Sequence, residues 1–146
     1  MRVCSSSIVV FLALCLGTLG CGKNDREPLH PVRGHIEYDG KPVPHAFLVL
    51  HPVKATGKES TKPRAKVAED GSFVVETYAA KDGAPAGEYV VTIEWYLSNA
   101  VAGGGESDDL PARNYLPQRY SKVETSGLRV SVQPGKNEIP TIQLTP

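Results

Sequence analysis

The stretch from Lys81 to Trp95, KDGAPAGEYVVTIEW, changes character in its middle. Its first half contains Gly and Pro residues, which interrupt regular secondary structure. From Glu88 to Leu97, large apolar side chains alternate with more polar ones, as expected for a β-strand with one buried face. The sequence therefore predicts a loop that leads into a long core strand. The side chains expected to face inward are those of Tyr89, Val91, Ile93, Trp95 and Leu97.

Short runs of the same β type, separated by turn signals, continue on both sides of this strand. The other predicted strands cover Val32–Tyr38, Pro42–Pro52, Ala65–Glu69, Ser72–Thr77, Ser126–Gln133 and Glu138–Thr145. Asp39-Gly40 and Asp70-Gly71 predict hairpins, because glycine accepts a positive φ without a Cβ clash. Pro140 lacks a backbone donor, so the last strand is predicted to be an edge strand or to carry a bulge. No segment predicts a helix, and the pattern indicates an all-β sandwich of seven strands.

The first residues of the chain have the layout of a secretory signal peptide. Arg2 precedes an apolar run from Ile8 to Leu16, and small residues follow it. The run is shorter than the ~20 residues that a membrane-spanning helix needs. We therefore expect three parts, which are a signal peptide at 1–20, a polar tether at 21–30 and a β-sandwich domain at 31–146.

Cys21 stands directly after this leader, in the sequence TLGCGK. The stretch resembles the lipobox of bacterial lipoproteins, in which a small residue, here Gly20, precedes a cysteine that is acylated. Thr18 occupies the position where the lipobox usually has Leu. The resemblance implies a lipid on Cys21, and Gly22 after it favours the outer membrane. The alternative is ordinary export with a free thiol on Cys21.

Charge and cysteine content exclude several classes of protein. The 16 Lys and Arg residues balance the 16 Asp and Glu residues, and no basic run occurs, so a nucleic-acid partner is not expected. The 3 cysteines are Cys4, Cys15 and Cys21. Cleavage before Cys21 leaves a single thiol, which can form neither an internal disulfide nor a cysteine-based zinc site. The stability of the domain must then come from its apolar core.

Several motifs occur in an order that is found in one bacterial family. They are Gly34 in the first strand, DGKP at Asp39–Pro42, the apolar strand Ala46–Pro52, DGSF at Asp70–Phe73 and GEYVVTI at Gly87–Ile93. Together they resemble the small carboxypeptidase-regulatory-like, or transthyretin-like, lipoproteins of planctomycete-type bacteria. The resemblance covers nearly all of the chain after Cys21. It implies a seven-stranded Greek-key β-sandwich on an envelope lipoprotein, with Ala46, Leu48 and Leu50 in the core.

The long segment Ser98–Thr125 carries the residues with the best claim to bind a partner. Long loops without secondary structure are often functional, and Tyr and Arg are enriched at binding hot spots. The four candidates are Arg113, Tyr115, Arg119 and Tyr120. The alternative is that this loop packs against a sheet and covers it through the side chains of Leu110, Leu116 and Tyr120.

Histidines and acidic residues suggest two ion sites. His35 and His45 lie on either side of the Asp39-Gly40 turn, so a β-ladder would bring them together, with Glu37 on the same face as His35. Two imidazoles and a carboxylate suit zinc, and this trio supports the alternative of a metal-binding or enzymatic β-sandwich. The acidic stretch Gly103–Asp109 offers oxygen ligands for calcium, but its spacing matches no calcium-binding motif.

The sequence contains no nucleophile elbow and no other coherent set of catalytic residues. We therefore expect a non-catalytic module that uses no cofactor. It is anchored to an envelope membrane through its N-terminal lipid, with the domain in the periplasm or outside the cell. Its expected role is structural, or the binding of an envelope protein or a glycan.

Overall fold

The computed structural model describes residues 26–54, 61–96 and 113–146. Short β-strands dominate these ranges, so the predicted all-β class is confirmed. The strands are β1 (Leu29–His30), β2 (Val32–Tyr38), β3 (Lys41–Pro42), β4 (Phe47–Pro52), β5 (Arg64–Lys66), β6 (Ser72–Val74), β7 (Ala84–Pro85), β8 (Gly87–Glu94), β9 (Leu128–Val132), β10 (Asn137–Glu138) and β11 (Ile142–Leu144). A short 3-10 helix, η2 (Gln118–Ser121), lies in the segment for which no helix was expected.

Two of the predicted strands are each divided in two. The run Pro42–Pro52 becomes β3 and β4, and the chain between them passes through His45, which has a positive φ of 63°. The C-terminal run becomes β10 and β11, with Pro140 in the gap between them. Proline has no N–H to give to a ladder, which explains the interruption. The described residues therefore form more and shorter strands than the seven expected.

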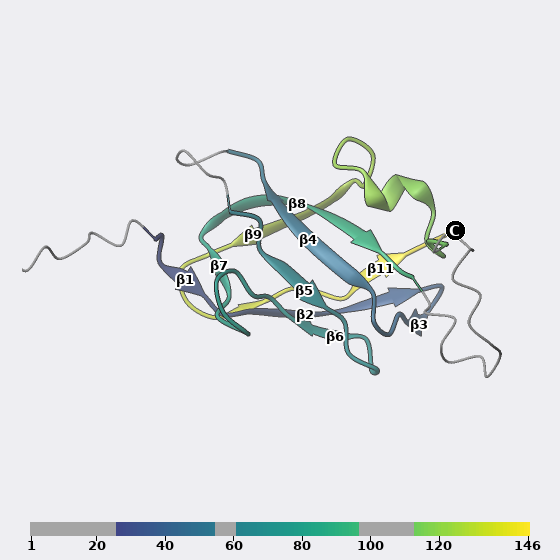
Figure 1. Ribbon diagram of the computed structural model, residues 1–146, viewed down its shortest axis with the longest axis horizontal. Coiled ribbons are helices and arrows are strands. Elements are labelled where there is room, and N and C mark those ends of the chain that lie inside the picture. Colours follow the sequence, from purple (N-terminus) through teal and green to yellow (C-terminus); the bar gives the residue numbers. More distant parts are fainter. Residues whose placement is uncertain (1–25, 55–60, 97–112) are drawn as a thin grey trace, which may run out of the picture.

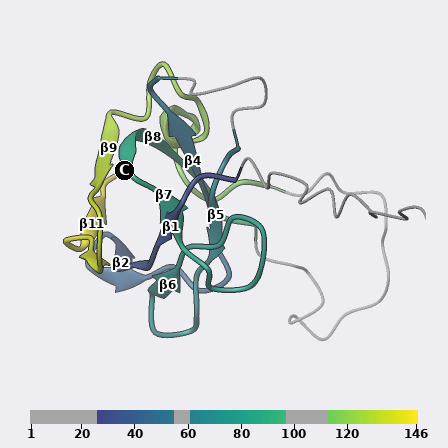
Figure 2. The ribbon, with the colours of Figure 1, turned by 90° about the vertical axis from the view of Figure 1, so that its left-hand side faces the viewer.

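The longer strands form two sheets. One is four-stranded and antiparallel, in the order β5-β4-β8-β9. The other is built on β2, which pairs antiparallel with β3 and β6 and parallel with β10 and β11. In Figure 2 the β4, β8 and β9 layer lies over the β2, β6 and β11 layer. The arrangement is sandwich-like, and neither sheet closes on itself.

Alternate side chains of both layers fill the space between the sheets. On β4, Leu48 and Leu50 are fully buried, whereas Phe47 keeps 43% of its surface exposed. On β8, Tyr89, Val91 and Ile93 are buried, as the alternation predicts. The β2 layer contributes side chains such as Val32, Ile36 and Leu144. Each fully buried side chain of this size stabilises the fold by about 1.5–3 kcal/mol, which fixes the register of β4 and β8.

One of the two predicted hairpins forms as expected. Asp39 and Gly40 have φ values of 50° and 71°, and they connect β2 to β3 with Tyr38 opposite Lys41. Positive φ at both central residues matches the twist of the flanking strands.

The second predicted hairpin, about Asp70-Gly71, forms in part, and its two arms also pair with other strands. The chain does turn back there, because Ala68 N donates to Ser72 O at 2.8 Å. However, β5 pairs with β4 and β6 pairs with β2. The two arms meet again at the Arg64–Glu76 bridge, where the two residues exchange backbone hydrogen bonds of 2.9 and 2.8 Å. Side chains on both arms, including Val67 and Phe73, are buried. The turn therefore joins the two sheets at one edge.

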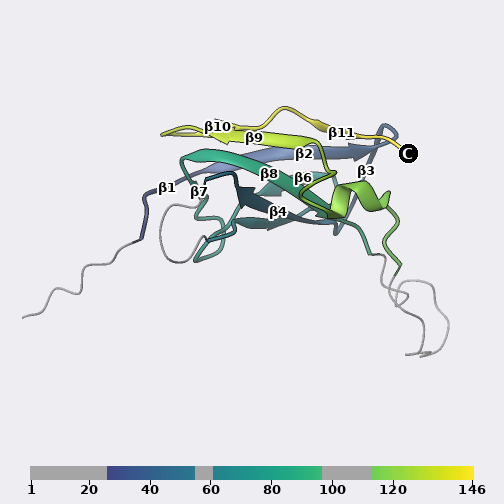
Figure 3. The same ribbon diagram turned by 90° about the horizontal axis from the view of Figure 1, so that it is seen from above.

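A small ladder precedes the main sheets. Leu29 and His30, which the sequence assigns to the tether, form β1 and pair antiparallel with β7. β7 itself lies inside the predicted loop that opens the KDGAPAGEYVVTIEW stretch. Gly83 makes this possible, because its φ is 95° and a Cβ there would overlap the His30 carbonyl group. Figures 1 and 3 place the β1–β7 ladder at one end of the domain, and the end of β8 and the C-terminus toward the other.

Candidate functional site

Part of the predicted binding loop serves to cover the fold. Leu116 and Tyr120 are buried, with 4% and 6% of their surfaces exposed, and both belong to the core cluster. η2 packs against β8 and carries Tyr120 inward. The alternative that the loop packs against a sheet is thus confirmed for these two residues. Leu110 lies outside the described residues.

Arg119 and Tyr120 fasten the C-terminal residues to this loop. Arg119 Nη2 donates to the carbonyl oxygens of Thr145, at 2.6 Å, and Pro146, at 2.7 Å. Tyr120 OH accepts from Thr145 N at 3.0 Å and donates to Thr145 O at 3.2 Å. Burial alone would raise the pKa of Tyr120, but the hydrogen bonds from Thr145 and Arg119 outweigh it and lower the pKa. Two of the four candidate residues are therefore used within the domain.

The other two candidates remain at the surface. Arg113 is exposed, and Tyr115 keeps 45% of its surface in solvent. The Tyr115 ring lies 6.0 Å from the ring of Trp95, tilted by 58°. Tyr115 N donates to Trp95 O at 2.9 Å, so the segment runs alongside the end of β8. At this end of the sandwich, Tyr115 of the predicted loop is therefore exposed to solvent beside Trp95.

Sequence reasoning missed the hydrogen bonds of Asn114 and Trp95 that organise this end. Asn114 Oδ1 accepts hydrogen bonds from Trp95 N, at 3.0 Å, and Leu116 N, at 3.1 Å. Trp95 Nε1 donates to Pro44 O at 2.9 Å. One signal in the sequence pointed to Trp95, because it lies at the end of the apolar alternation of β8. An inward-facing side chain at that position lies at the rim of the core. Nothing in the sequence indicated that Asn114 would lie beside it.

The β2–β3 ladder is too short to pair His35 with His45. His35 lies opposite Ser72 in the β2–β6 ladder, and the β2–β3 ladder ends at Pro42, before His45 is reached. His35 Nδ1 does lie 3.7 Å from Glu37 Oε1, so two members of the expected trio lie together. Within the described ranges, no three His, Cys, Asp or Glu side chains are placed to hold a metal ion. The acidic stretch Gly103–Asp109 falls outside those ranges.

Both histidines instead support the turn that joins the sheets. His35 Nε2 lies 2.5 Å from the carbonyl oxygen of Asp70. His45 Nε2 lies 2.8 Å from Glu69 Oε1. Asp70 Oδ1 in turn accepts from Ser72 N at 2.9 Å. Hydrogen bonding from the Ser72 side chain, followed by that from its backbone N–H, lowers the pKa of Asp70. The contacts hold the 69–72 turn between β5 and β6.

The remaining histidines also contact the domain itself. His51 Nε2 lies 2.9 Å from Thr92 Oγ1, across the β4–β8 pair. Burial, followed by the nearby charge of Lys62, lowers the pKa of His51. His30 Nδ1 accepts from Gly135 N at 3.2 Å. All four histidines therefore lie against groups of the protein.

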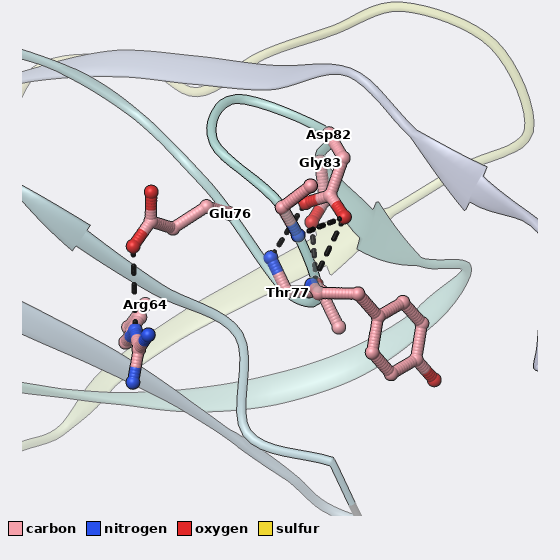
Figure 4. A network of polar contacts seen from close by, with 7 residues as sticks. Arg64, Glu76, Thr77, Asp82 and Gly83 are labelled. Atoms are coloured by element: carbon pink, nitrogen blue, oxygen red, sulfur yellow. Dashed lines mark hydrogen bonds and ion pairs between the residues drawn. The ribbon is translucent and has the colours of Figure 1, made fainter.

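A network of hydrogen bonds, partly exposed to solvent, holds the loop before β7 in place (Figure 4). Asp82 Oδ1 accepts from Thr77 N at 2.6 Å, and Asp82 Oδ2 accepts from Tyr78 N at 2.9 Å and Ala79 N at 2.7 Å. Thr77 Oγ1 donates to Gly83 O at 2.5 Å. Burial raises the pKa of Asp82, but the three N–H groups outweigh it, so the pKa is lowered overall. The network holds the loop that presents β7 to β1.

Comparisons with known proteins identify no family for the chain. No family model matches it, and no curated protein matches it. Among solved structures it is similar to a 9R-lipoxygenase from Cyanothece PCC8801, with a TM-score of 0.40 and 14% sequence identity. The match covers 80% of this chain but only 16% of the lipoxygenase chain. In the described ranges, no helix is long and apolar enough to cross a membrane.

Proposed function

We propose that the protein is a non-catalytic, lipid-anchored β-sandwich module of the bacterial cell envelope. The sequence around Cys21 supports the anchor, and Cys21 lies outside the described residues. β1 starts at Leu29, which is 8 residues after Cys21 (29 − 21). An extended chain spans at most about 3.3–3.6 Å per residue, so this tether holds the β1–β7 end within roughly 30 Å of the lipid.

The proposal that the module is non-catalytic rests on the contacts that its polar side chains make within the domain. Within the described ranges, four residues that the sequence singles out for ligand or metal binding hold turns and the C-terminal residues in place. Arg119 and Tyr120 bind the C-terminal residues, and His35 and His45 contact the turn between β5 and β6. A general acid, base or metal ligand needs its polar atoms free to reach a substrate or ion. The alternative enzyme or metal protein centred on His35, His45 and Glu37 therefore has weaker support.

The strand pattern supports the transthyretin-like or carboxypeptidase-regulatory-like assignment within this proposal. The β1–β7 ladder is an addition to the two main sheets. If β3 with β4 and β10 with β11 are each treated as one interrupted strand, seven strands remain in those sheets. The proposed Greek-key connection would relate these strands. The domain itself then serves as a spacer or as a binding module for a protein or glycan in the periplasm or outside the cell.

Metabolic labelling with a fatty-acid analogue tests the anchor. We expect label on the wild-type protein and none on a Cys21→Ser variant. Cys15→Ser is the matched control, because that cysteine lies in the leader and should leave the label unchanged. Equal labelling of the Cys21→Ser and wild-type proteins would remove the anchor from the proposal. Fractionation of inner and outer membranes then tests the expected outer-membrane location.

Crosslinking in the native envelope tests the role of the domain. The full-length protein, crosslinked in intact cells, should be recovered attached to an envelope protein or to a cell-wall glycan. A variant with both His35→Ala and His45→Ala should give the same products and keep a cooperative thermal transition. Loss of a metal-dependent activity in that variant would instead favour the metal-binding alternative.

A further inference from the structure

Three turns of the domain contain an aspartate followed by a glycine. The pairs are Asp39-Gly40, Asp70-Gly71 and Asp82-Gly83. Glycine has no side chain to shield its nitrogen, so this nitrogen can attack the preceding carboxyl group and close a five-membered imide ring. The attack requires rotation about the Cα–C bond of the aspartate and close approach of the nitrogen to Cγ. The contacts of each pair therefore decide whether it reacts.

The Asp82-Gly83 pair is held at both reacting groups. The Asp82 carboxylate accepts three backbone hydrogen bonds from the 77–79 segment. Gly83 is buried, and its nitrogen donates to Val75 O at 3.0 Å. These bonds must open before the nitrogen can reach Cγ. The lowered pKa of Asp82 also reduces the protonated fraction, which carries the better leaving group.

The Asp70-Gly71 pair is held in a similar way. Gly71 is buried, and its nitrogen donates to Ala68 O at 3.0 Å. A Cβ at Gly71 would lie 2.8 Å from the His35 ring, so the backbone has little room to rotate. Asp70 Oδ1 accepts from Ser72 N at 2.9 Å, which fixes the carboxylate toward the following residues.

Asp39-Gly40 lacks each of these restraints. Both residues are exposed, and no atom lies within 4 Å of the position of a Cβ on Gly40. Within the described residues, Gly40 N makes no backbone hydrogen bond and the Asp39 carboxylate accepts none. β3, which follows the turn, has 2 residues, and both are exposed. Rotation of this turn therefore breaks few contacts.

We propose that Asp39-Gly40 is a site of spontaneous isoaspartate formation, a modification that is independent of the proposed function. Gly40 N attacks Asp39 Cγ, so that a C–N bond forms and the carboxyl hydroxyl group leaves with the amide proton as water. A second water molecule then opens the imide. Cleavage of the C–N bond at Cγ restores aspartate, whereas cleavage at the main-chain carbonyl gives isoaspartate. The overall composition is unchanged.

The product alters the hairpin between β2 and β3. In isoaspartate the main chain runs through Cβ and Cγ, so the turn gains one backbone carbon. A two-residue turn of this type matches the twist of its strands only with its normal backbone. Tyr38 lies opposite Lys41 across the turn, and Asp39 N donates to Leu144 O at 3.1 Å. We expect conversion to weaken both contacts.

Peptide mapping of the aged protein tests the proposal. The full-length protein is incubated at neutral pH and cleaved after arginine, which gives peptides 34–64 and 65–113. The first contains Asp39-Gly40 and the second contains the other two pairs. Chromatography with electron-transfer fragmentation measures isoaspartate in each. In the folded protein we expect it to form at least about tenfold faster in 34–64, because a buried hydrogen-bonded turn is costly to open.

Unfolding removes this difference. In guanidinium chloride, isoaspartate should form about twice as fast in 65–113 as in 34–64, because two pairs lie in the former and one in the latter. This control shows that contacts of the folded chain, and not the local sequence, select Asp39-Gly40. The variant Asp39→Glu would need a six-membered ring, so it should remove the product from peptide 34–64.

Two asparagine variants give a matched comparison. Asp39→Asn keeps the turn, because Asn-Gly favours the same geometry, and it forms the same imide with loss of ammonia. Asp70→Asn is the control, because its amide oxygen can still accept from Ser72 N. We expect deamidation at 39 to be at least about tenfold faster than at 70 in the folded protein. Urea midpoints verify that both variants fold.

Four results would overturn the inference. Isoaspartate could form at equal rates per Asp-Gly pair in the two peptides of the folded protein. It could be absent from 34–64 of the folded protein while the unfolded chain reacts. The product in 34–64 could persist in Asp39→Glu, or the two asparagine variants could deamidate at the same rate.

Discussion

Replacement of Asp82 by Ala should be among the most damaging changes to an exposed loop of this domain. The Asp82 carboxylate accepts three backbone hydrogen bonds, of 2.6, 2.9 and 2.7 Å, from consecutive residues of the 77–79 segment. Because the loop is at the surface, water replaces part of what is lost, and each bond contributes about 1 kcal/mol net. Asp82→Ala should therefore lower the free energy of unfolding by about 2–3 kcal/mol.

The Asp82→Asn variant separates charge from shape. One carboxylate oxygen accepts from Thr77 N and the other from Tyr78 N and Ala79 N. An amide keeps one acceptor and places an NH2 group against the remaining N–H donors, so one or two bonds are lost. We expect a cost of about 1–2 kcal/mol, between the wild type and Asp82→Ala.

The same contact predicts how stability depends on pH. An unfolded Asp has a pKa of about 3.9, and the pKa of Asp82 is lowered in the folded protein. A lowered pKa means that the unfolded chain binds protons first as the pH falls. The contribution of Asp82 is thus fully present above about pH 4 and is lost as the pH falls through the folded pKa. The gap between wild type and Asp82→Asn should narrow over that window.

Urea unfolding followed by Trp95 fluorescence measures these effects. For a domain of this size, a loss of about 2–3 kcal/mol moves the midpoint down by roughly 1–2 M. Glu88→Gln is the control, because Glu88 is exposed and its side chain makes no hydrogen bond within the described residues. An Asp82→Ala midpoint within about 0.3 M of the wild type, or an unchanged gap at low pH, would refute the role given to this carboxylate.

Three further changes test other contacts of the fold. Gly83→Ala should cost about 2–3 kcal/mol or more, because the new Cβ meets the His30 carbonyl at a φ of 95°; a normal urea midpoint would contradict the β1–β7 ladder. Tyr89→Phe removes the buried hydrogen bond from its hydroxyl to Pro85 O, of 2.8 Å, and should cost about 1 kcal/mol in thermal unfolding. Burial raises the pKa of Tyr89 to about 12, so the unfolded chain ionises first as the pH rises. The free energy of unfolding of the wild type should therefore decline between about pH 10 and that value. The decline should be smaller in Tyr89→Phe. Tyr120→Phe leaves Thr145 N without its hydrogen-bond acceptor, so hydrogen exchange of the Thr145 amide should be faster than in the wild type. Equal exchange rates would argue against the hydrogen bond between Tyr120 and Thr145.

The periodicity of the sequence predicted which side chains of β4 and β8 face the core. The buried positions on β4 and β8 follow the alternation of Leu48, Leu50, Val91 and Ile93, because the pleat of a strand sends successive side chains to opposite sides. This property is local, so a short window of sequence reveals it.

The choice of neighbouring strands could not be predicted in the same way. The Asp70-Gly71 turn marks where the chain reverses, and its arms contact each other at Ala68–Ser72 and Arg64–Glu76, but the turn does not determine which other strands the arms pair with. That depends on β4 and β2, which lie far away in the sequence and offer longer edges. Parallel pairing of β10 and β11 with β2 likewise depends on the return path of the C-terminal segment.

The candidate site shows the same division between local and distant information. Composition singled out Arg113, Tyr115, Arg119 and Tyr120 as candidates, but packing decides which of them face solvent. The 3-10 turn at η2 directs Tyr120 inward, whereas Tyr115 pairs with the rim residue Trp95. Which tyrosine remains available depends on contacts that cross 19 or more residues, such as Trp95 N to Asn114 Oδ1.

Three loops of the described ranges, which contain no cysteine, are fixed in the same way. In each, one short polar side chain binds several backbone groups. Asp82 does so before β7, and Asn114 does so beside β8. In the turn before β10, Asn137 accepts from Gln133 N at 2.8 Å and donates to Gln133 O at 2.9 Å and Gly135 O at 3.0 Å.

Such side chains satisfy backbone groups that a loop would otherwise leave to water. Each costs little rotamer entropy because Asn and Asp are short. The loop before β7, the segment beside β8 and the turn before β10 are therefore each held by hydrogen bonds within the protein. In the proposed anchored module, Asp82 would stiffen the loop that presents β7 to β1, the strand that follows the tether, and Asn114 would fix the segment that runs along the end of β8.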